Sequence, residues 1–115
     1  KEVYTIEIVP ELAKRATADL KRLGYKNIHV REGDGYKGWP EAAPFDAIIV
    51  TCAPEAVPEP LVSQLKDGGR MIIPVGPAGD QTLVLLRKHG DKLEKHAVLP
   101  VRFVPMTGEA QQRQE

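Results

Sequence analysis

Residues 33–40 read Gly-Asp-Gly-Tyr-Lys-Gly-Trp-Pro, and residues 45–51, Phe-Asp-Ala-Ile-Ile-Val-Thr, follow them at loop distance. An acidic residue between two glycines, after one apolar segment and before another, is typical of the turn that ends a strand in an α/β nucleotide-binding sheet. The second segment is β-branched and apolar enough to form a strand buried on both faces. This stretch therefore predicts an α/β fold.

The flanking segments extend the same alternation. Residues 3–9, Val-Tyr-Thr-Ile-Glu-Ile-Val, read as a buried strand. A helix follows, because Pro10 suits a first helical turn and Gly24 a helix end. Residues 27–31 predict a short strand leading into the glycine turn. The remaining predicted elements are a short helix over residues 58–65, a parallel strand over 70–76 and an antiparallel hairpin over 81–87 and 93–99.

Length and charge limit the possible classes of protein. The chain has 115 residues, so we expect one α/β domain over residues 1–110 with a polar tail over 111–115. Sixteen basic and sixteen acidic residues give no net charge, which argues against binding to nucleic acid or to an anionic membrane. No apolar run approaches the roughly 20 residues of a spanning helix.

The single cysteine, Cys52, excludes an intramolecular disulfide framework and any multi-cysteine metal site in this chain, and it fits a reducing cytoplasmic location. Without a nearby base, Cys52 reads as a small buried hydrophobe and not as a nucleophile. The histidines at positions 29, 89 and 96 are scattered, so we expect no metal site and no catalytic triad.

Ligands of open α/β sheets bind outside the carboxyl ends of the strands, which directs attention to Glu7 and Asp34. The Glu7 carboxylate can accept hydrogen bonds from two neighbouring ribose hydroxyls, or it can be an ordinary solvated side chain. Asp34 can accept from an exocyclic adenine amine while Gly35 lets the backbone approach a ring face, or the two can form a plain turn. Residue types alone leave these alternatives open.

Several motifs taken together resemble one family. The matching segments are residues 3–8, 23–25, 33–39, 43–51, 65–70 and 101–108. Gly-Asp-Gly-Tyr-Lys-Gly-Trp at 33–39, followed in order by Arg-Phe-Val-Pro-Met-Thr-Gly at 102–108, is specific. The sequence closely resembles protein-L-isoaspartate O-methyltransferases over nearly its whole length.

The resemblance implies a Rossmann-like S-adenosylmethionine-dependent methyltransferase sheet, mostly parallel, with an antiparallel C-terminal hairpin. It implies an enzyme that repairs proteins by methylating the α-carboxylate of L-isoaspartyl residues, with S-adenosylhomocysteine as the product. By similarity, Glu7 would hold the cofactor ribose, Asp34 and Gly35 the adenine, and Thr107 and Gln112 would help to close the cofactor site. Isoaspartyl-containing proteins or peptides would be the partners.

The sequence also departs from the family pattern. The glycine-rich strand, turn and helix that wraps the methionine part of the cofactor has no counterpart here, and neither has the serine or threonine regarded as catalytic. By family analogy, the missing strand is central, between those that begin at Val3 and Phe45. We therefore expect an incomplete, low-activity fragment with two open strand edges, capable of self-association. The alternative is a non-catalytic α/β module that associates with proteins through those edges.

Overall fold

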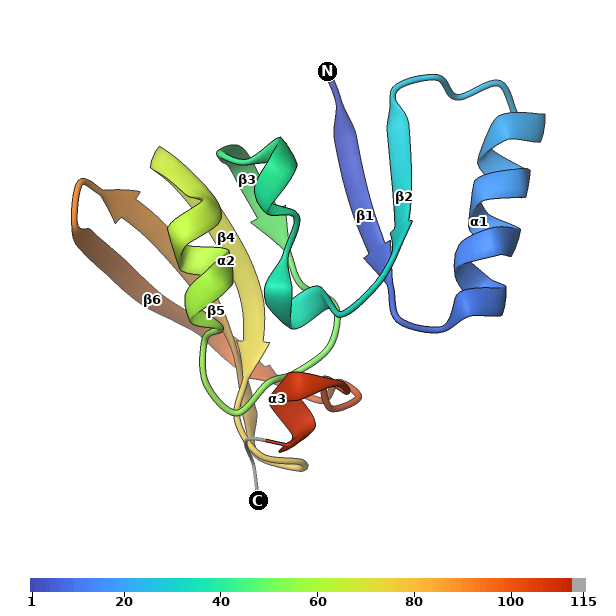
Figure 1. The fold of residues 1–115 in the computed structure, drawn as a ribbon. Coiled ribbons are helices and arrows are strands. Elements are labelled where there is room, and N and C mark those ends of the chain that lie inside the picture. The colour runs from blue at the N-terminus through green and yellow to red at the C-terminus, as the bar shows by residue number, and fades with distance from the viewer. Residues whose placement is uncertain (113–115) are drawn as a thin grey trace.

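The structure is a computed structural model that describes residues 1–112 and alternates helices with strands (Figure 1). The elements are β1 (Val3–Glu7), α1 (Pro10–Arg22), β2 (Ile28–Glu32), β3 (Phe45–Ile49), α2 (Glu59–Gln64), β4 (Leu65–Val75), β5 (Gln81–His89), β6 (Lys92–Val101) and α3 (Glu109–Gln112). Two short 3₁₀ turns, Gly35–Lys37 and Pro40–Ala42, lie between β2 and β3. The α/β prediction is confirmed, and the predicted tail boundary at 110/111 falls within α3.

The strands form two separate sheets. β1 and β2 pair in parallel, whereas β3, β4, β5 and β6 form a four-stranded sheet in that order. Within the larger sheet β3 is parallel to β4, and the remaining pairs are antiparallel. The predicted C-terminal hairpin is thus confirmed as β5 and β6.

The facing edges of β1 and β3 are not hydrogen-bonded to each other (Figure 1), and in the described part of the chain neither has a strand partner on that side. The prediction that these two strands are buried was wrong. Ile49 at the end of β3 is 73% exposed, and residues 3–5 of β1 are exposed as well. Their apolar composition suits a fully covered sheet, but the described residues cover only part of them.

Aromatic rings connect the two sheets where backbone pairing does not. The ring of Tyr4 on β1 stacks on His29 of β2, with centroids 4.8 Å apart. It also meets the edges of Trp39 at 5.0 Å and of Phe45 on β3 at 5.8 Å. The guanidinium of Arg31 lies 4.2 Å from the centroid of the Trp39 ring. Such ring contacts add to the stability gained from burial of the rings.

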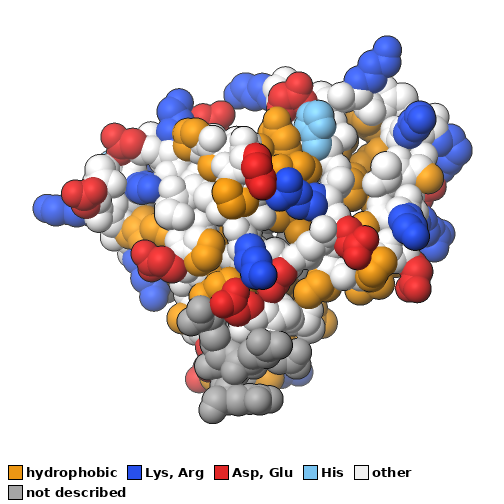
Figure 2. All heavy atoms as spheres, in the orientation of Figure 1, with side chains coloured by type: hydrophobic (Ala, Val, Ile, Leu, Met, Phe, Trp, Pro, Cys, Tyr) orange, Lys and Arg blue, Asp and Glu red, His pale blue; other side chains and the backbone are white. Residues whose placement is uncertain are grey.

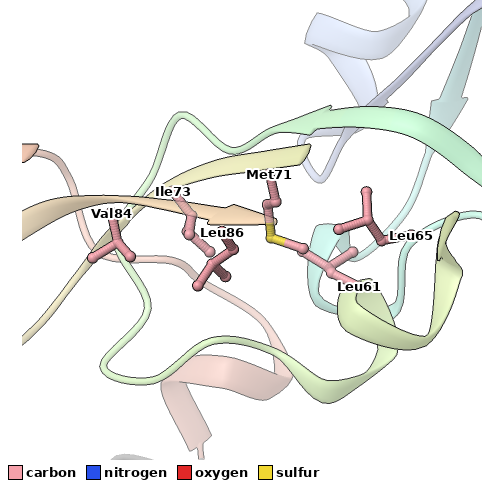
Figure 3. Packing of buried hydrophobic residues seen from close by; sticks show 6 residues of the cluster. All are labelled: Leu61, Leu65, Met71, Ile73, Val84 and Leu86. Atoms are coloured by element: carbon pink, nitrogen blue, oxygen red, sulfur yellow. The ribbon is translucent and has the colours of Figure 1, made fainter. Parts of the chain in front are cut away.

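The main hydrophobic core lies between α2 and the larger sheet. Its buried members are Leu61, Leu65, Met71, Ile73, Val84 and Leu86 (Figure 3). Met71 and Ile73 alternate along β4 and are fully buried. The period-two pattern of a strand that is covered on this face by a helix explains the arrangement.

Helix α1 forms within the predicted limits and packs against β2 and β1 (Figure 1). Pro10 occupies its first turn, Ala13 is buried, and Lys21 and Arg22 stand in its last turn, where basic side chains interact favourably with the helix dipole. This helix supports the strand that carries Glu7.

Charges of both signs are interspersed over the face shown in Figure 2, in keeping with the zero net charge of the sequence. No large single-sign patch dominates this face. Among the described residues, no helix is both long and apolar enough to cross a membrane.

The loop after β2 is fixed to α2 by a buried glutamine. Gln64 accepts a hydrogen bond from the backbone N–H of Trp39 at 2.8 Å and donates to the carbonyl of Lys37 at 2.9 Å. Gly38, between them, has φ of 66°. A Cβ at this position would lie 2.8 Å from Cδ of Gln64, too close for the two to coexist unmoved. Only glycine fits this turn.

We expect Gly38→Ala to lower the free energy of unfolding by about 1 to 3 kcal/mol, because it combines a strained backbone with a clash against Gln64. Gly35→Ala is the matched control, since a Cβ there meets no atom within 4 Å. Urea denaturation of the two variants measures the difference. Equal midpoints would contradict the tight fit inferred at Gly38.

Candidate functional site

The candidate site lies at the carboxyl ends of the first three strands. Glu7 is the last residue of β1, and the Gly33-Asp34-Gly35 turn follows β2 directly. The backbone N–H of Gly33 donates to the carbonyl of Glu7 at 2.9 Å, so these two strand ends are adjacent. Cys52 comes shortly after the end of β3. This is the edge of the sheet at which α/β proteins bind ligands.

Glu7 is half-buried at this edge. One oxygen of its carboxylate, Oε2, accepts a hydrogen bond from the backbone N–H of Ile8 at 3.0 Å. This bond holds the side chain near its own backbone at the strand end. Within the described part of the chain, the other oxygen, Oε1, forms no hydrogen bond. It can therefore accept from a ligand hydroxyl.

Both oxygens of the Asp34 carboxylate accept backbone hydrogen bonds. Oδ1 accepts from the N–H of Tyr36 at 3.0 Å and so caps the short 3₁₀ turn that begins at Gly35. Oδ2 accepts from the N–H of Glu109 at 2.9 Å, a residue 75 positions later. The sequence predicted the turn at Asp34 but gave no sign of the second bond.

The C-terminal segment after β6 is anchored on the larger sheet before it reaches Asp34. The N–H of Ala53 donates to Val104 at 2.7 Å, and the N–H of Met106 donates to Ala53 at 3.1 Å. Buried Gln81 accepts from the N–H of Phe103 at 2.6 Å and donates to the carbonyl of the same residue at 3.1 Å. These bonds bring the segment to the site.

Thr107, one of the predicted site residues, lies on this segment and is exposed. It directly precedes Gly108, which touches Asp34. Gln112 ends α3, and its side chain lies outside what the structure describes. The structure thus brings Asp34, Gly35 and the backbone next to Thr107 together, with Glu7 adjacent through Gly33.

A cavity of about 240 Å³ opens between the ends of β1 and β3. Gly35 is the predicted site residue that lines it, while Glu7 and Asp34 are each next in sequence to a lining residue. The lining residues are Tyr4, Thr5, Ile6, Gly35, Gly38, Trp39, Phe45, Ala47, Ile48, Ile49, Val50, Thr51, Cys52, Leu61, Gln64 and Met106. A mostly apolar cavity with a few polar groups at its rim suits a small organic ligand.

Cys52 lines the same cavity, and the charges of Asp34 and Glu7 affect the pKa of its thiol. Burial raises the pKa of its thiol, and the negative charges of Asp34 and Glu7 raise it further. The thiol is therefore kept in its neutral form. This agrees with the prediction that Cys52 is not a nucleophile, because the thiolate is the reactive species.

Sequence reasoning missed two buried glutamines, Gln64 and Gln81. Each uses its side-chain amide to satisfy a backbone N–H and a backbone carbonyl in a loop of the site. The available signal was a neutral polar residue directly beside an apolar segment, at the end of α2 for Gln64 and at the start of β5 for Gln81. Buried polar groups need hydrogen-bond partners, so such residues often tie down loops.

The histidines lie outside this site. His29 stacks on Tyr4, whereas His89 and His96 both contact Glu94 on the hairpin, at 3.2 and 2.8 Å. The hydrogen bonds from His96 and then His89 lower the pKa of Glu94. In the part of the chain that the structure describes, no group of three His, Cys, Asp or Glu residues could hold a metal ion.

Comparison with known proteins gives a consistent result. A family model described as Protein-L-isoaspartate(D-aspartate) O-methyltransferase matches residues 1–111. A protein-L-isoaspartate O-methyltransferase of Gloeobacter violaceus is 54% identical over 112 residues, which are 96% of this chain and 55% of the relative. One of Opitutus terrae is 59% identical over 109 residues, covering 94% and 47% respectively. The chain thus spans about half the length of these relatives.

Solved structures agree with the sequence matches. A protein-L-isoaspartate O-methyltransferase superposes with a TM-score of 0.88 and 32% identity, over 98% of this chain and 38% of the other. A Plasmodium falciparum β-aspartate methyltransferase in complex with S-adenosyl-L-homocysteine gives a TM-score of 0.78 and 26% identity, over 92% and 52%. The methyltransferase fold predicted from the motifs is confirmed.

We expect the pH midpoint for alkylation of Cys52 by iodoacetamide to lie above that of an ordinary thiol, because burial and nearby carboxylates disfavour the thiolate. Glu7→Gln should lower the midpoint by removing one of those charges. Glu11→Gln, which removes the same charge from the first turn of α1, is the control. Identical midpoints in the Glu7 and Glu11 variants would contradict the proximity of Glu7 to the thiol.

Proposed function

The chain belongs to the protein-L-isoaspartate(D-aspartate) O-methyltransferase family, and we propose that it contributes to methyl transfer from S-adenosylmethionine to the α-carboxylate of L-isoaspartyl residues. The family match over residues 1–111 is the observation that carries this proposal. The S-adenosyl-L-homocysteine complex of the Plasmodium falciparum relative supports the choice of cofactor.

The residues present at the strand ends fit an adenosine. The Glu7 carboxylate keeps one oxygen without a hydrogen bond among the described residues, as a ribose-binding acid requires. Gly35 lines the cavity without a side chain, which suits close approach of an adenine ring. We propose that Glu7 holds the ribose, that Asp34 and Gly35 contact the adenine, and that Thr107 and Gln112 close the site.

When bound, S-adenosylmethionine would supply a methyl group on a positively charged sulfur. The nucleophile is a substrate carboxylate, which is already ionised near neutral pH, so the chain needs no strong general base. Its own residues would orient the adenosine and exclude water through the apolar cavity walls, such as Ile6, Ile48 and Met106. The chemistry supplied would be transfer of this methyl group to a carboxylate oxygen of the substrate, with S-adenosylhomocysteine as the other product.

Low turnover by these 115 residues alone is a further part of the proposal. No residue of this sequence matches the serine or threonine that the family resemblance implies as catalytic. The groups proposed to hold the adenosine, on Glu7, Asp34 and Gly35, lie in contrast within the described residues. We therefore propose that this chain binds the cofactor and turns over slowly by itself.

The partners proposed are isoaspartyl-containing proteins or peptides in the cytoplasm. The mixed surface charge gives no support to nucleic-acid or membrane binding. We also propose that the open edges of β1 and β3 pair with another strand, including one from a second copy, since unpaired edges expose hydrogen-bonding backbone. A purely non-catalytic association module gains no support, because the matched relatives are named as methyltransferases.

Calorimetric titration tests the cofactor part. We expect the chain to bind S-adenosylhomocysteine. Glu7→Gln should weaken this binding by about 1 to 3 kcal/mol, the usual cost of losing a hydrogen bond that a charged carboxylate accepts. Glu11→Gln on α1 should bind as the unaltered chain does. A folded chain with no measurable binding would count against the proposed adenosine site.

Substrate selectivity tests the activity. In the intact protein, radiolabelled methyl transfer should occur to a peptide containing L-isoaspartate and be at least tenfold slower with the same peptide containing L-aspartate. The selectivity follows from the position of the carboxylate, since the two peptides have equal charge. Equal rates on both peptides would refute the proposed substrate.

A further inference from the structure

The loop after β2 follows the smaller sheet, and the C-terminal segment follows the larger one. The two meet at the carboxylate of Asp34. Asp34 follows the smaller sheet, whereas residues 103–106 are fixed beside the larger one through hydrogen bonds to Ala53 and Gln81. The bond from the Glu109 N–H to Asp34 Oδ2, 2.9 Å long, connects them. It is part-buried and spans 75 residues of sequence.

Gly108 shows how closely the two segments fit. Its φ is 85°, a conformation that other residues rarely adopt. A Cβ on Gly108 would lie 2.6 Å from Oδ2 of Asp34, 2.8 Å from Oδ1 and 2.7 Å from Cγ. Any side chain at this position would push the carboxylate away from the Glu109 N–H. Backbone conformation and close approach therefore both require glycine.

The hydrogen bond between the Glu109 N–H and Asp34 lies beside the cavity. Gly35, next to Asp34, lines one part of it, and Met106, two residues before Gly108, lines another. Met106 is also buried. Releasing Asp34 from Glu109 would free the segment that carries Thr107 and Gln112 to move relative to Gly35.

We infer that Asp34 is a positioning residue that fastens residues 107–112 against the loop after β2 and so sets the affinity of the site for adenosine-containing ligands. Its carboxylate accepts hydrogen bonds from two backbone N–H groups, those of Tyr36 and Glu109. Asp34 thus acts through the C-terminal segment, in addition to any direct contact with adenine. The affinity part of this inference rests on the proposed function.

The test uses Asp34→Asn, Gly108→Ala and the double variant of the intact protein. Asparagine replaces one of the two acceptor oxygens by an NH2 group, so one of the two N–H donors loses its acceptor, whereas Gly108→Ala displaces the carboxylate without changing it. Gly24→Ala is the control, because its φ of 87° imposes the same backbone strain and its Cβ meets no atom within 4 Å. Hydrogen exchange of peptides covering residues 103–112 and calorimetric binding of S-adenosylhomocysteine are measured for each.

We expect both single variants to speed exchange in this segment and to weaken binding, each about tenfold, as for loss of one charge-assisted hydrogen bond. The double variant should bind S-adenosylhomocysteine no more weakly than the weaker-binding single variant, since both substitutions break the same hydrogen bond between Glu109 and Asp34. Gly24→Ala should change neither the exchange of this segment nor the affinity.

Unchanged affinity in Gly108→Ala, with weaker binding in Asp34→Asn, would overturn the inference and leave only a direct contact of Asp34 with the ligand. Additive losses in the double variant would overturn it too. Unchanged hydrogen exchange of residues 103–112 in both single variants would refute the claim that Asp34 holds this segment in place. If the unaltered protein binds no S-adenosylhomocysteine, the proposed function and the affinity part fail together, while exchange still decides whether Asp34 fastens the segment.

Discussion

The ring of Tyr4 on β1 makes direct contact with Phe45 on β3 and so joins the edges of the two sheets. Backbone hydrogen bonds join strands within each sheet, but none joins β1 to β3. Tyr4 reaches across this gap to Phe45 and Trp39 and is supported from behind by His29. Tyr4, Trp39 and Phe45 also line the cavity between β1 and β3, so the same rings connect the sheets and form part of its wall.

The loops at the carboxyl edge are fixed by polar side chains that each satisfy two backbone groups. Gln64 fixes the turn around Gly38, Gln81 fixes the chain at Phe103, and Asp34 joins two segments from opposite sheets. A buried amide or carboxylate with two backbone partners is costly to displace, since displacement leaves polar groups unsatisfied. The loops at the carboxyl edge are therefore held by side-chain hydrogen bonds to the backbone as well as by the strands that they connect.

The groups proposed to hold the adenosine come from segments that lie far apart in the sequence. The groups suited to an adenosine come from β1, the loop after β2 and the C-terminal segment. The cavity beside them is walled by the unpaired edges of β1 and β3. The proposed adenosine site and the unpaired strand edges are therefore neighbours in the structure.

The sequence by itself determined the family and most of the helices and strands, although it predicted neither α3 nor the start of β4 at Leu65. Local periodicity and the placement of Pro10 and Gly24 defined α1, and the motifs at 33–39 and 102–108 identified the methyltransferase fold. Only the tertiary structure decided the exposure of Ile49 and the partners of Asp34. Exposure depends on which elements cover a strand, and the Glu109 bond joins residues 75 positions apart. Neither leaves a local pattern, because each arises only when distant segments pack together.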